Sequence, residues 1–276
     1  MNKSKLLKDL INSEETLIMP DAYDGLSAKV IEKSGFPAVQ CSGYSISLSK
    51  QIKSEKQLSL EDNLKTTEEI IKSVDIPVNA DGENGYGDDE ILSENIKKFI
   101  NIGTAGINIE DQNFNQSNNV KIIDVNQMIN KINLIKDTIN KSNNKFFVLN
   151  ARTDALLIED RIQAQKIAIE RVNKYLENGA DLCFICHVKT YSELKLFTKE
   201  INGPISIAVG LPYNYNEFSI RDCQELGIAR VSLPTYLIYN SIKYLLDDLK
   251  LLKEDPDFKR IKKGKKIPDD VNILLS

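Results

Sequence analysis

The fold is decided by a stretch that joins a helix to a strand, residues 96–111, with the sequence IKKFINIGTAGINIED. Its first half continues an amphipathic helix, because Leu92, Ile96 and Phe99 fall on one face at helical spacing. Gly103 then stands where a helix ends in a left-handed residue, and an apolar run follows, as in a buried parallel strand. The run closes with two acidic residues. The stretch therefore predicts one helix-to-strand connection of a parallel sheet.

The same unit of helix, glycine and strand recurs along the chain. It returns at residues 34–39, 178–182 and 226–231. Counted together with the runs that lack this glycine, eight strand-like segments alternate with stretches long enough for a helix. The segments are Leu17–Pro20, Ala38–Ser42, Ile76–Asp81, Gly106–Glu110, Phe146–Arg152, Leu182–His187, Ile205–Val209 and Arg230–Leu233. Eight evenly spaced units predict an α/β fold of the (β/α)8 TIM barrel type, with a doubly wound open sheet as the alternative.

The length and the end of the chain complete the prediction of the fold. The 276 residues fit a single (β/α)8 barrel domain over residues 1–276. The last strand-like segment ends near Leu233, so residues 240–276 are expected to form a C-terminal helical tail. Its final residues, Val271 to Leu275, are apolar. Two placements stay open for this tail, docking on a neighbouring subunit and packing on its own barrel.

Composition and charge exclude several classes of protein. Hydrophobic residues make up 41% of the chain and charged residues 28%, which is enough for a globular core. The net charge of −4 argues against nucleic acid as a partner, and no run approaches the roughly 18 apolar residues of a membrane span. The first residues lack the apolar core of a signal peptide. We therefore expect a cytoplasmic protein with reduced cysteines, and neither a nucleic-acid nor a membrane partner.

Acidic side chains gather at the predicted carboxyl ends of the strands, the end at which barrels carry active sites. These ends carry Asp21, Tyr23, Asp24, Ser42, Gly43, Tyr44, Asp81, Glu83, Glu110, Asp111, Arg152, Asp154, Cys186 and His187. Carboxylates that converge on one opening repel one another unless a cation neutralises them, and oxygen ligands suit Mg²⁺, with Mn²⁺ as the alternative. The arginine among them can hold a substrate carboxylate through two hydrogen bonds. The set predicts a small carboxylate substrate and a metal that stabilises an enolate.

Some of these positions have a plainer structural interpretation. Asp24 precedes a helical pattern and is expected to be its N-cap. Cys183 and Cys186 form a CxxC inside a strand, which favours buried thiols over a redox or zinc site. The glycine-rich residues 82–87 lack the lysine of a phosphate loop, so they are expected to carry Glu83 toward the opening. His187, the only histidine, is expected to contact the substrate.

Six stretches in order along the chain resemble one known family, the isocitrate lyase and phosphoenolpyruvate mutase superfamily. The likeness runs from about Pro20 to Pro234. It rests on PDAYDGLSAKVIEKSGFPAV (20–39), SGYSIS (42–47), VNADGENGYGD (78–88), AGINIEDQ (105–112), LNARTDA (149–155) and YLENGADLCF (175–184). The resemblance implies a Mg²⁺-dependent barrel that acts on a small 2-oxo or 2-hydroxy carboxylate through an enolate. It also implies a homotetramer of dimers that exchange a C-terminal helix, and we expect a homotetramer or a homodimer.

The resemblance also implies roles for individual residues. The Ser42-Gly43 turn, followed by Tyr44, is similar to the backbone cradle for the substrate's carboxylate and keto oxygens. Arg152 resembles the carboxylate clamp, and we expect catalytic roles for Arg152, Tyr23 and Asn118. The expected metal site is made of carboxylates. Its members are Asp81 and Glu110, which match the family's metal-site acids, and Glu83 and Glu55, which are the best candidates for the remaining acids.

The chain departs from the family's patterns at two places. In the gating loop, residues 112–119 read QNFNQSNN, without the cysteine and histidine of the lyases. Glutamines stand where the mutases have lysines, while Asn118 matches the mutase asparagine. In the metal motif, Asn79-Ala80-Asp81 replaces Asp-Ala-Asp, and two residues are inserted before the Gly-Tyr-Gly, so Glu83 is expected to supply the missing carboxylate.

Three functions remain open at this point. The first is a Mg²⁺-dependent carbon–carbon lyase or decarboxylase acting on a small 2-oxo or 2-hydroxy dicarboxylate through an enolate, since loss of CO2 needs no loop cysteine. The second is carbon–phosphorus chemistry, as a phosphoenolpyruvate mutase or a phosphonopyruvate hydrolase. The third is a catalytically silent barrel that binds a carboxylate. The sequence leaves the substrate, the general acid or base and the choice between Mg²⁺ and Mn²⁺ open.

Overall fold

Eight parallel strands close into a barrel in the computed structural model, which describes residues 2–114, 121–254, 271 and 274. Each strand pairs with its neighbours in chain order, and the last pairs with the first. The strands are β1 (Leu17–Ala22), β2 (Val39–Cys41), β3 (Val78–Asp81), β4 (Gly106–Glu110), β5 (Val148–Thr153), β6 (Leu182–Ile185), β7 (Ile205–Ala208) and β8 (Arg230–Leu233). The predicted barrel is confirmed, and every strand overlaps its predicted segment.

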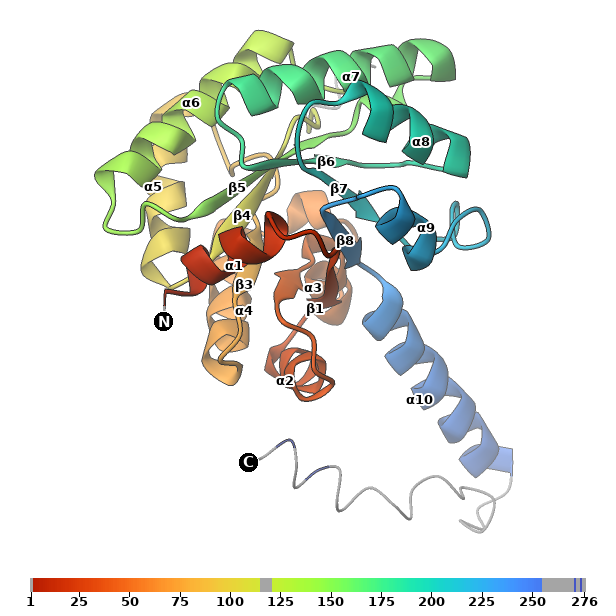
Figure 1. Ribbon diagram of the computed structural model, residues 1–276. Coiled ribbons are helices and arrows are strands. Elements are labelled where there is room, and N and C mark those ends of the chain that lie inside the picture. The colour runs from red at the N-terminus through yellow and green to blue at the C-terminus, as the bar shows by residue number, and fades with distance from the viewer. Residues whose placement is uncertain (1, 115–120, 255–270, 272–273, 275–276) are drawn as a thin grey trace.

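Helices alternate with the strands and surround the barrel (Figure 1). They are α1 (Lys3–Ile11), α2 (Gly25–Lys33), α3 (Gly43–Ser49), α4 (Leu60–Ser73), α5 (Asp89–Asn101), α6 (Val125–Lys141), α7 (Arg161–Glu177), α8 (Tyr191–Glu200), α9 (Ile220–Glu225) and α10 (Tyr236–Glu254). Two short 3-10 turns, η1 (Glu55–Gln57) and η2 (Ala155–Leu157), follow α3 and β5. Both lie on the carboxyl side of the barrel, so they are placed to shape its opening.

The recurring sequence unit folds as the pattern predicts. The glycines that end α2, α5, α7 and α9, namely Gly35, Gly103, Gly179 and Gly227, have φ values of 86°, 95°, 98° and 71°. A side chain at these positions would strain the backbone, so each helix stops there and a strand begins three or four residues later. The face that the spacing predicts for α5 is buried, with Leu92, Ile96 and Phe99 at most 1% exposed. Burial of that face against the barrel holds the helix in place.

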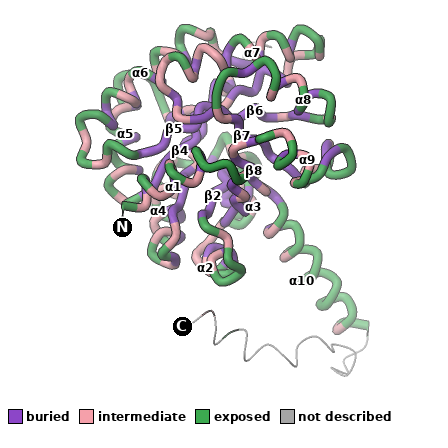
Figure 2. Tube along the Cα trace, in the orientation of Figure 1, coloured by how far each residue is buried: buried purple, intermediate pink, exposed green. Residues whose placement is uncertain are grey.

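Helix α10 differs from the others because most of it leaves the barrel. Figure 1 shows it projecting away from the strands, and Figure 2 shows that most of its length is exposed. Ile238 near its start is buried. Farther along, Leu245, Leu246 and Leu249 are each more than 60% exposed. None of the helices in the described part of the chain is long and apolar enough to cross a membrane.

Asp24 is the N-cap of α2, as expected. Its carboxylate accepts a hydrogen bond of 2.7 Å from the amide of Ser27, and the Ser27 hydroxyl lies 3.1 Å from the amide of Asp24, which completes a capping box. The carboxylate is therefore occupied by the helix terminus. This explains why an acid at this strand end takes no part in the cavity described below.

Replacing Asp24 with Ala should lower the free energy of unfolding by about 1 kcal/mol, because the amide of Ser27 at the start of α2 loses its acceptor. Asp24→Asn, which keeps an acceptor, should recover most of this loss. Urea unfolding of the three proteins measures both effects. A loss of ligand binding or activity without a loss of stability would show that Asp24 serves the site instead.

Candidate functional site

A cavity of about 440 Å³ opens at the carboxyl ends of the strands, where the acidic residues are expected to meet. Of the residues singled out in the sequence as candidate site residues, Ser42, Tyr44, Glu55, Asp81, Arg152 and His187 line it. Three others lie directly behind this lining: Gly43 donates its amide to Asp81, Glu83 lies beside Gly43, and Glu110 forms an ion pair with Arg152. The structure therefore brings most of the expected residues together.

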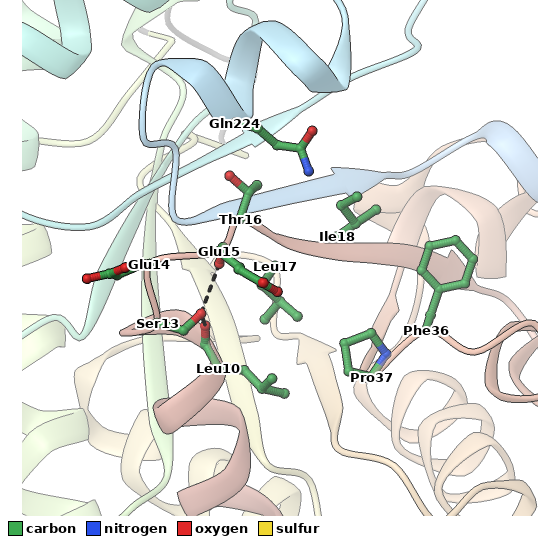
Figure 3. A pocket seen from close by; sticks show the side chains of 10 residues that line it. All are labelled: Leu10, Ser13, Glu14, Glu15, Thr16, Leu17, Ile18, Phe36, Pro37 and Gln224. Carbon is green, nitrogen blue, oxygen red and sulfur yellow. Dashed lines mark hydrogen bonds between the residues drawn. The ribbon is translucent and has the colours of Figure 1, made fainter.

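A larger hollow, of about 570 Å³, lies at the opposite end of the barrel between α1, β1 and α9 (Figure 3). Its lining combines apolar side chains such as Leu10 and Phe36 with Glu14 and Glu15. Ser13 donates its hydroxyl to the carbonyls of Leu10 and Glu15, at 2.9 Å each. The described residues that line it include no lysine, arginine or histidine. Because barrels place their chemistry at the carboxyl ends of the strands, the smaller cavity is the candidate site.

Four carboxylates gather on one side of this cavity. Glu83 and Glu110 are 1% and 2% exposed, while Asp81 and Glu55 are partly buried at the opening. Asp81 accepts a hydrogen bond of 3.0 Å from the amide of Gly43, and the amide of Glu110 donates to the carbonyl of Glu83 at 2.9 Å. Oε1 of Glu83 is buried without a hydrogen-bond partner. A buried carboxylate oxygen without a donor is a position that a cation would satisfy.

The pKa values of these carboxyls are all displaced upward. Burial raises the pKa of Glu83 well above its usual range, and the charges of Asp81 and Glu110 raise it further. Burial likewise raises the pKa of Glu110 and of Asp81, although Arg152 opposes it in both cases. Burial also raises the pKa of Glu55. The cluster therefore retains protons unless a cation replaces them.

The described carboxylates fit Mg²⁺ held by Asp81, Glu83, Glu110 and Glu55. They offer only hard oxygen ligands, and one of those oxygens has no other partner. Asn79, which stands at the position of the first acid of the family motif, forms hydrogen bonds inside the barrel instead of joining the acidic cluster. Its side-chain amide donates to Oε1 of Gln40 at 2.8 Å and to Oδ1 of Asn108 at 2.9 Å, inside the barrel. Glu83 reaches the cluster from the inserted loop, with a left-handed φ of 50°.

Arg152 is held rigidly on the other side of the cluster. Its Nε and Nη2 donate to the two carboxylate oxygens of Asp154, at 2.9 and 3.0 Å, and its Nη1 lies 2.7 Å from Oε2 of Glu110. Burial raises the pKa of Asp154, but Arg152 and His187 together outweigh it and hold that pKa below its usual range. Asp154 is thus the partner that orients the arginine. The sequence placed it at the same strand end without assigning this role.

The Ser42-Gly43 turn begins α3 at the rim of the cavity. Ser42 is the N-cap, and its hydroxyl accepts from the amide of Ser45 at 3.2 Å. A side chain on Gly43 would collide with the carboxylate of Glu83, so only glycine permits this close approach. The hydroxyl of Tyr44 lies 2.7 Å from that of Tyr239 on α10. The turn therefore places its backbone against the acidic cluster, while Tyr44 connects the rim to α10.

His187 lies at the opening with a left-handed φ of 64°. Its Nε2 is 3.5 Å from Oδ1 of Asp154, and its ring packs 5.5 Å from that of Tyr213. Asp154, Cys186 and His187 could each offer a ligand atom to a softer metal. Both oxygens of Asp154 already accept from Arg152, however, and the guanidinium would repel a cation bound there. All four cysteines of the chain are buried and free, as expected for structural thiols.

The structure does not bring Tyr23 to the cavity. Its hydroxyl lies 3.0 Å from that of Ser241 on α10, so it points to the outer helix and offers no contact to a ligand of the cavity. The other expected catalytic residue, Asn118, lies outside the described residues, as does most of the loop that carries it. Of that loop, Phe114 is described, and the ammonium of Lys56 lies 5.2 Å from the centre of its ring.

A polar layer forms the floor of the cavity, and the sequence analysis missed it. Arg230 at the start of β8 is 1% exposed and donates to Gln40 at 2.5 Å and to Asn108 at 3.2 Å. Asn150 donates to the same oxygen of Asn108. Burial lowers the pKa of Arg230 to about 10. No local signal marks an arginine that begins an apolar run as a residue of the barrel interior.

We expect the metal-free protein to lose stability as the pH rises from about 5 to 8, because carboxyls with raised folded-state pKa values favour folding only while they are protonated. Mg²⁺ replaces those protons, so it should raise the melting temperature more at the upper end of this range. At about 100 times its Kd, Mg²⁺ would add about 2.7 kcal/mol of stability.

Thermal unfolding in EDTA and in excess Mg²⁺ measures these effects. Glu83→Gln is the matched variant, since it removes one buried charge and should reduce both the pH dependence and the gain from Mg²⁺. An equal gain from Mg²⁺ at both ends of the range would contradict a site made of these carboxyls.

Comparison with known proteins places the chain among enzymes of one family. The family model described as phosphoenolpyruvate phosphomutase matches residues 7–252. The carboxyvinyl-carboxyphosphonate phosphorylmutase of Arabidopsis thaliana is 30% identical over 253 residues, which cover 89% of this chain and 73% of that protein. The 2,3-dimethylmalate lyase of Eubacterium barkeri is 27% identical over 260 residues, covering 92% and 88%. The second relative is a lyase by name, in agreement with the expectation of a lyase-type enzyme.

A solved structure shows that the fold is shared as well. The crystal structure of a phosphonopyruvate hydrolase in complex with oxalate and Mg²⁺ superposes with a TM-score of 0.88 at 22% identity, covering 100% of this chain and 95% of that one. The family match extends over most of the chain, and the strand ends carry the residues on which the resemblance rests. The chain belongs to the phosphoenolpyruvate phosphomutase family, within the isocitrate lyase and phosphoenolpyruvate mutase superfamily.

Proposed function

We propose that the protein is a Mg²⁺-dependent carbon–carbon lyase or decarboxylase that acts on a small 2-oxo or 2-hydroxy dicarboxylate through an enolate. One observation carries the proposal. A cluster of carboxylates, of which Glu83 and Glu110 are buried and Glu83 has an unpartnered oxygen, lies beside the largely buried guanidinium of Arg152 at one cavity. The first group suits a hard divalent cation and the second suits a carboxylate. A small substrate with a carboxylate next to a keto or hydroxyl oxygen satisfies both.

The described carboxylates would hold the cation through Asp81, Glu83, Glu110 and Glu55. A bound Mg²⁺, or Mn²⁺ in its place, supplies Lewis-acid stabilisation of the negative charge that develops on an enolate oxygen. The chain itself supplies a backbone turn without a side chain at Gly43, so a substrate can approach the cluster closely. The solved phosphonopyruvate hydrolase, which shares this fold, holds oxalate together with Mg²⁺, and this supports the proposal.

Arg152 binds and orients the substrate carboxylate. A guanidinium has five N–H donors, and the hydrogen bonds to Asp154 use one on Nε and one on Nη2. Nη1 lies 2.7 Å from Oε2 of Glu110 as an ion pair without a hydrogen bond, so the second donor of Nη2 and the donors of Nη1 remain for a substrate. They belong to a guanidinium whose position is fixed before the substrate binds, which reduces the entropic cost of ordering this side chain on binding.

The wall opposite the acidic cluster excludes water. Phe184, Cys186 and Ala208 are buried there, and Leu211 packs against them. The centre of the Phe184 ring lies 5.6 Å from the guanidinium carbon of Arg152. Apolar surroundings strengthen the electrostatic contacts of the arginine and protect a reactive enolate from solvent.

The loop sequence favours a reaction without a dedicated proton donor at the cleavage step. Residues 112–119 contain neither cysteine nor histidine. Loss of CO2 from a 2-oxo dicarboxylate leaves an enolate directly, so no acid is required at that stage. Carbon–phosphorus chemistry is the second candidate, because the family description and the Arabidopsis relative both concern phosphorus-transferring mutases.

Pyruvate release in the presence of Mg²⁺ tests the proposal, with oxaloacetate, methylisocitrate, dimethylmalate and phosphonopyruvate as substrates. Turnover of any of the first three supports the lyase or decarboxylase. Turnover of phosphonopyruvate alone contradicts it and favours the second candidate. If none is turned over, the mutase reaction, an untested substrate and a carboxylate-binding barrel remain, and titration with oxalate in the presence of Mg²⁺ is the next measurement.

Arg152→Lys should lower kcat/KM at least about a hundredfold, since an ammonium keeps the charge but cannot make two parallel hydrogen bonds. Arg221→Lys, at an exposed position on α9, is the matched control and should leave the kinetics unchanged. Steady-state kinetics on the active substrate, with circular dichroism to confirm folding, measure the effect. Equal kinetics for the two variants would remove Arg152 from the substrate site.

We also propose that α10 docks on a second copy of this chain, in a homodimer or homotetramer. The helix leaves its own barrel with Leu245, Leu246 and Leu249 exposed, and an apolar surface of this kind on a projecting helix is typical of a subunit interface (Figure 2). Its hydroxyl contacts to Tyr23 and Tyr44 tie the start of the helix to the rim of the site. Subunit contacts at α10 would therefore bear on the cavity.

Sedimentation of the wild-type protein should show an oligomer that the double substitution Leu245→Glu and Leu249→Glu converts to a monomer. The two charges would be buried without partners in an interface, which costs several kcal/mol. Lys250→Glu, at an exposed polar position of the same helix, should leave the oligomer intact. A wild-type monomer would refute the proposal.

The proposed compartment is the cytoplasm. The four cysteines are buried and free, which agrees with a reducing compartment.

A further inference from the structure

Asp111 is a buried carboxylate that does not line the cavity. It connects the strands and the helix that surround the charged residues of the cavity. Asp111 directly follows β4, is 0% exposed and is absent from the residues that line the cavity. Its Oδ2 accepts hydrogen bonds from Thr153 Oγ1 at 2.8 Å, Arg171 Nη1 at 3.0 Å and Tyr175 OH at 2.7 Å. Its Oδ1 accepts from the amide of Asp154 at 2.8 Å. Four donors on one carboxylate fix its position closely.

Two of these donors belong to the backbone segment that carries Arg152. The amide of Asp111 also donates to the carbonyl of Arg152, at 3.1 Å. The segment from Arg152 to Asp154 is therefore attached to Asp111 through the carbonyl of its first residue, the hydroxyl of its second and the amide of its third. Asp154 in turn receives both hydrogen bonds of the Arg152 guanidinium described above. The position of the guanidinium thus follows from the position of Asp111.

The other two donors anchor the carboxylate from outside the barrel. Arg171 and Tyr175 lie one turn apart on α7, and Arg171 also donates to Tyr175 at 3.0 Å. Arg171 additionally donates to the carbonyl of Ile123 at 2.7 Å, and the amide of Ile123 donates to the carbonyl of Asp111 at 2.9 Å. The ion pair with Arg171 compensates the buried charge of Asp111. Helix α7 therefore holds the carboxylate from the side away from the cavity.

We infer that Asp111 is a positioning residue of the site, which sets the place and orientation of the Arg152 guanidinium through Thr153 and Asp154. It touches no ligand of the cavity. A displacement of the guanidinium by about 1 Å would misalign its remaining donors with a substrate carboxylate, which is enough to reduce activity strongly. The inference rests on the proposed function only for the measurement of ligand affinity, because the position of Arg152 can be observed without a ligand.

The Nε–H signal of Arg152 in a nitrogen-15 NMR spectrum reports this position directly. The chain has six arginines, so the spectrum is simple, and Arg152→Lys identifies the signal by removing it. Asp111→Asn keeps the volume of the side chain but turns an amide toward donors, so it should shift the Arg152 signal. Tyr175→Phe removes one donor to the same carboxylate oxygen on the α7 side and should leave the signal in place.

Calorimetric titration with oxalate in the presence of Mg²⁺ gives the second measurement. Asp111→Asn should weaken oxalate binding about tenfold or more, while Tyr175→Phe should stay within about threefold of the wild type. The melting temperatures of both variants show whether a loss of affinity comes only from a loss of stability. If Asp111 had a merely structural role, the two variants would lose oxalate affinity in the same proportion to their loss of melting temperature. If the wild type binds no oxalate, the proposed function fails and the NMR comparison still decides the inference.

An unshifted Arg152 signal in Asp111→Asn would overturn the inference, and so would an equal shift in Tyr175→Phe. Should Asp111→Asn fail to fold, Thr153→Val takes its place, since it removes a hydroxyl donor to the same oxygen from the β5 side. It should shift the signal in the wild-type fold, and an unshifted signal there would overturn the inference as well.

Discussion

One buried guanidinium, that of Arg152, holds two buried carboxylates at the carboxyl end of the barrel. Glu110 and Arg152 stand opposite each other in the register of β4 and β5, so the pairing of the strands brings them together. Asp154 completes the group from the position directly after the end of β5. Taking each of these charges out of water costs several kcal/mol, and their attraction recovers that cost only when the geometry is close. Such a group contributes little to stability, which indicates that its purpose is to present the remaining donors of Arg152.

The charges of the site do not balance within the described residues. Glu110 and Asp154 are paired with Arg152, while Asp81, Glu83 and Glu55 surround the same cavity with raised pKa values. Arg230 below them donates from Nη1 and Nη2 to the amide oxygens of Asn108 and Gln40, while its Nε is buried without a hydrogen-bond partner. The surplus of negative charge is what a divalent cation would neutralise. The cavity therefore offers carboxylates that suit a metal ion next to a guanidinium that suits an anion.

A loop, in place of a strand, brings one acid of this cluster to the cavity. Asn79 occupies the strand position where the family carries an aspartate, and it bonds within the barrel instead. Glu83 comes from the insertion that follows β3, with a left-handed backbone and with Gly43 close against its carboxylate. The strained conformation costs about 1 to 3 kcal/mol and persists because neighbouring contacts hold it. In this chain a loop residue thus supplies a carboxylate next to those that the strand ends carry.

The sequence by itself determined the barrel, because helix periodicity, the glycines after helices and buried strand runs are local patterns that each segment carries. It also determined which strand ends bear Asp81, Glu110 and Arg152, since residues at the ends of parallel strands must share one face. It could not distinguish Tyr44, which lines the cavity, from Tyr23, which does not, because both follow strand ends and no local pattern sets the direction of the side chain.

The tertiary structure alone decided how the charges are shared. Asp154 was visible at a strand end, but its two bonds to Arg152 depend on a rotamer that no local pattern sets. Asp111 meets Tyr175 across 64 positions of the chain, and Arg230 meets Gln40 across 190. Such contacts arise from closure of the barrel, which brings distant strands and helices to one axis. Their energies depend on burial and on differences in distance of a few tenths of an ångström, and neither quantity can be derived from the sequence alone.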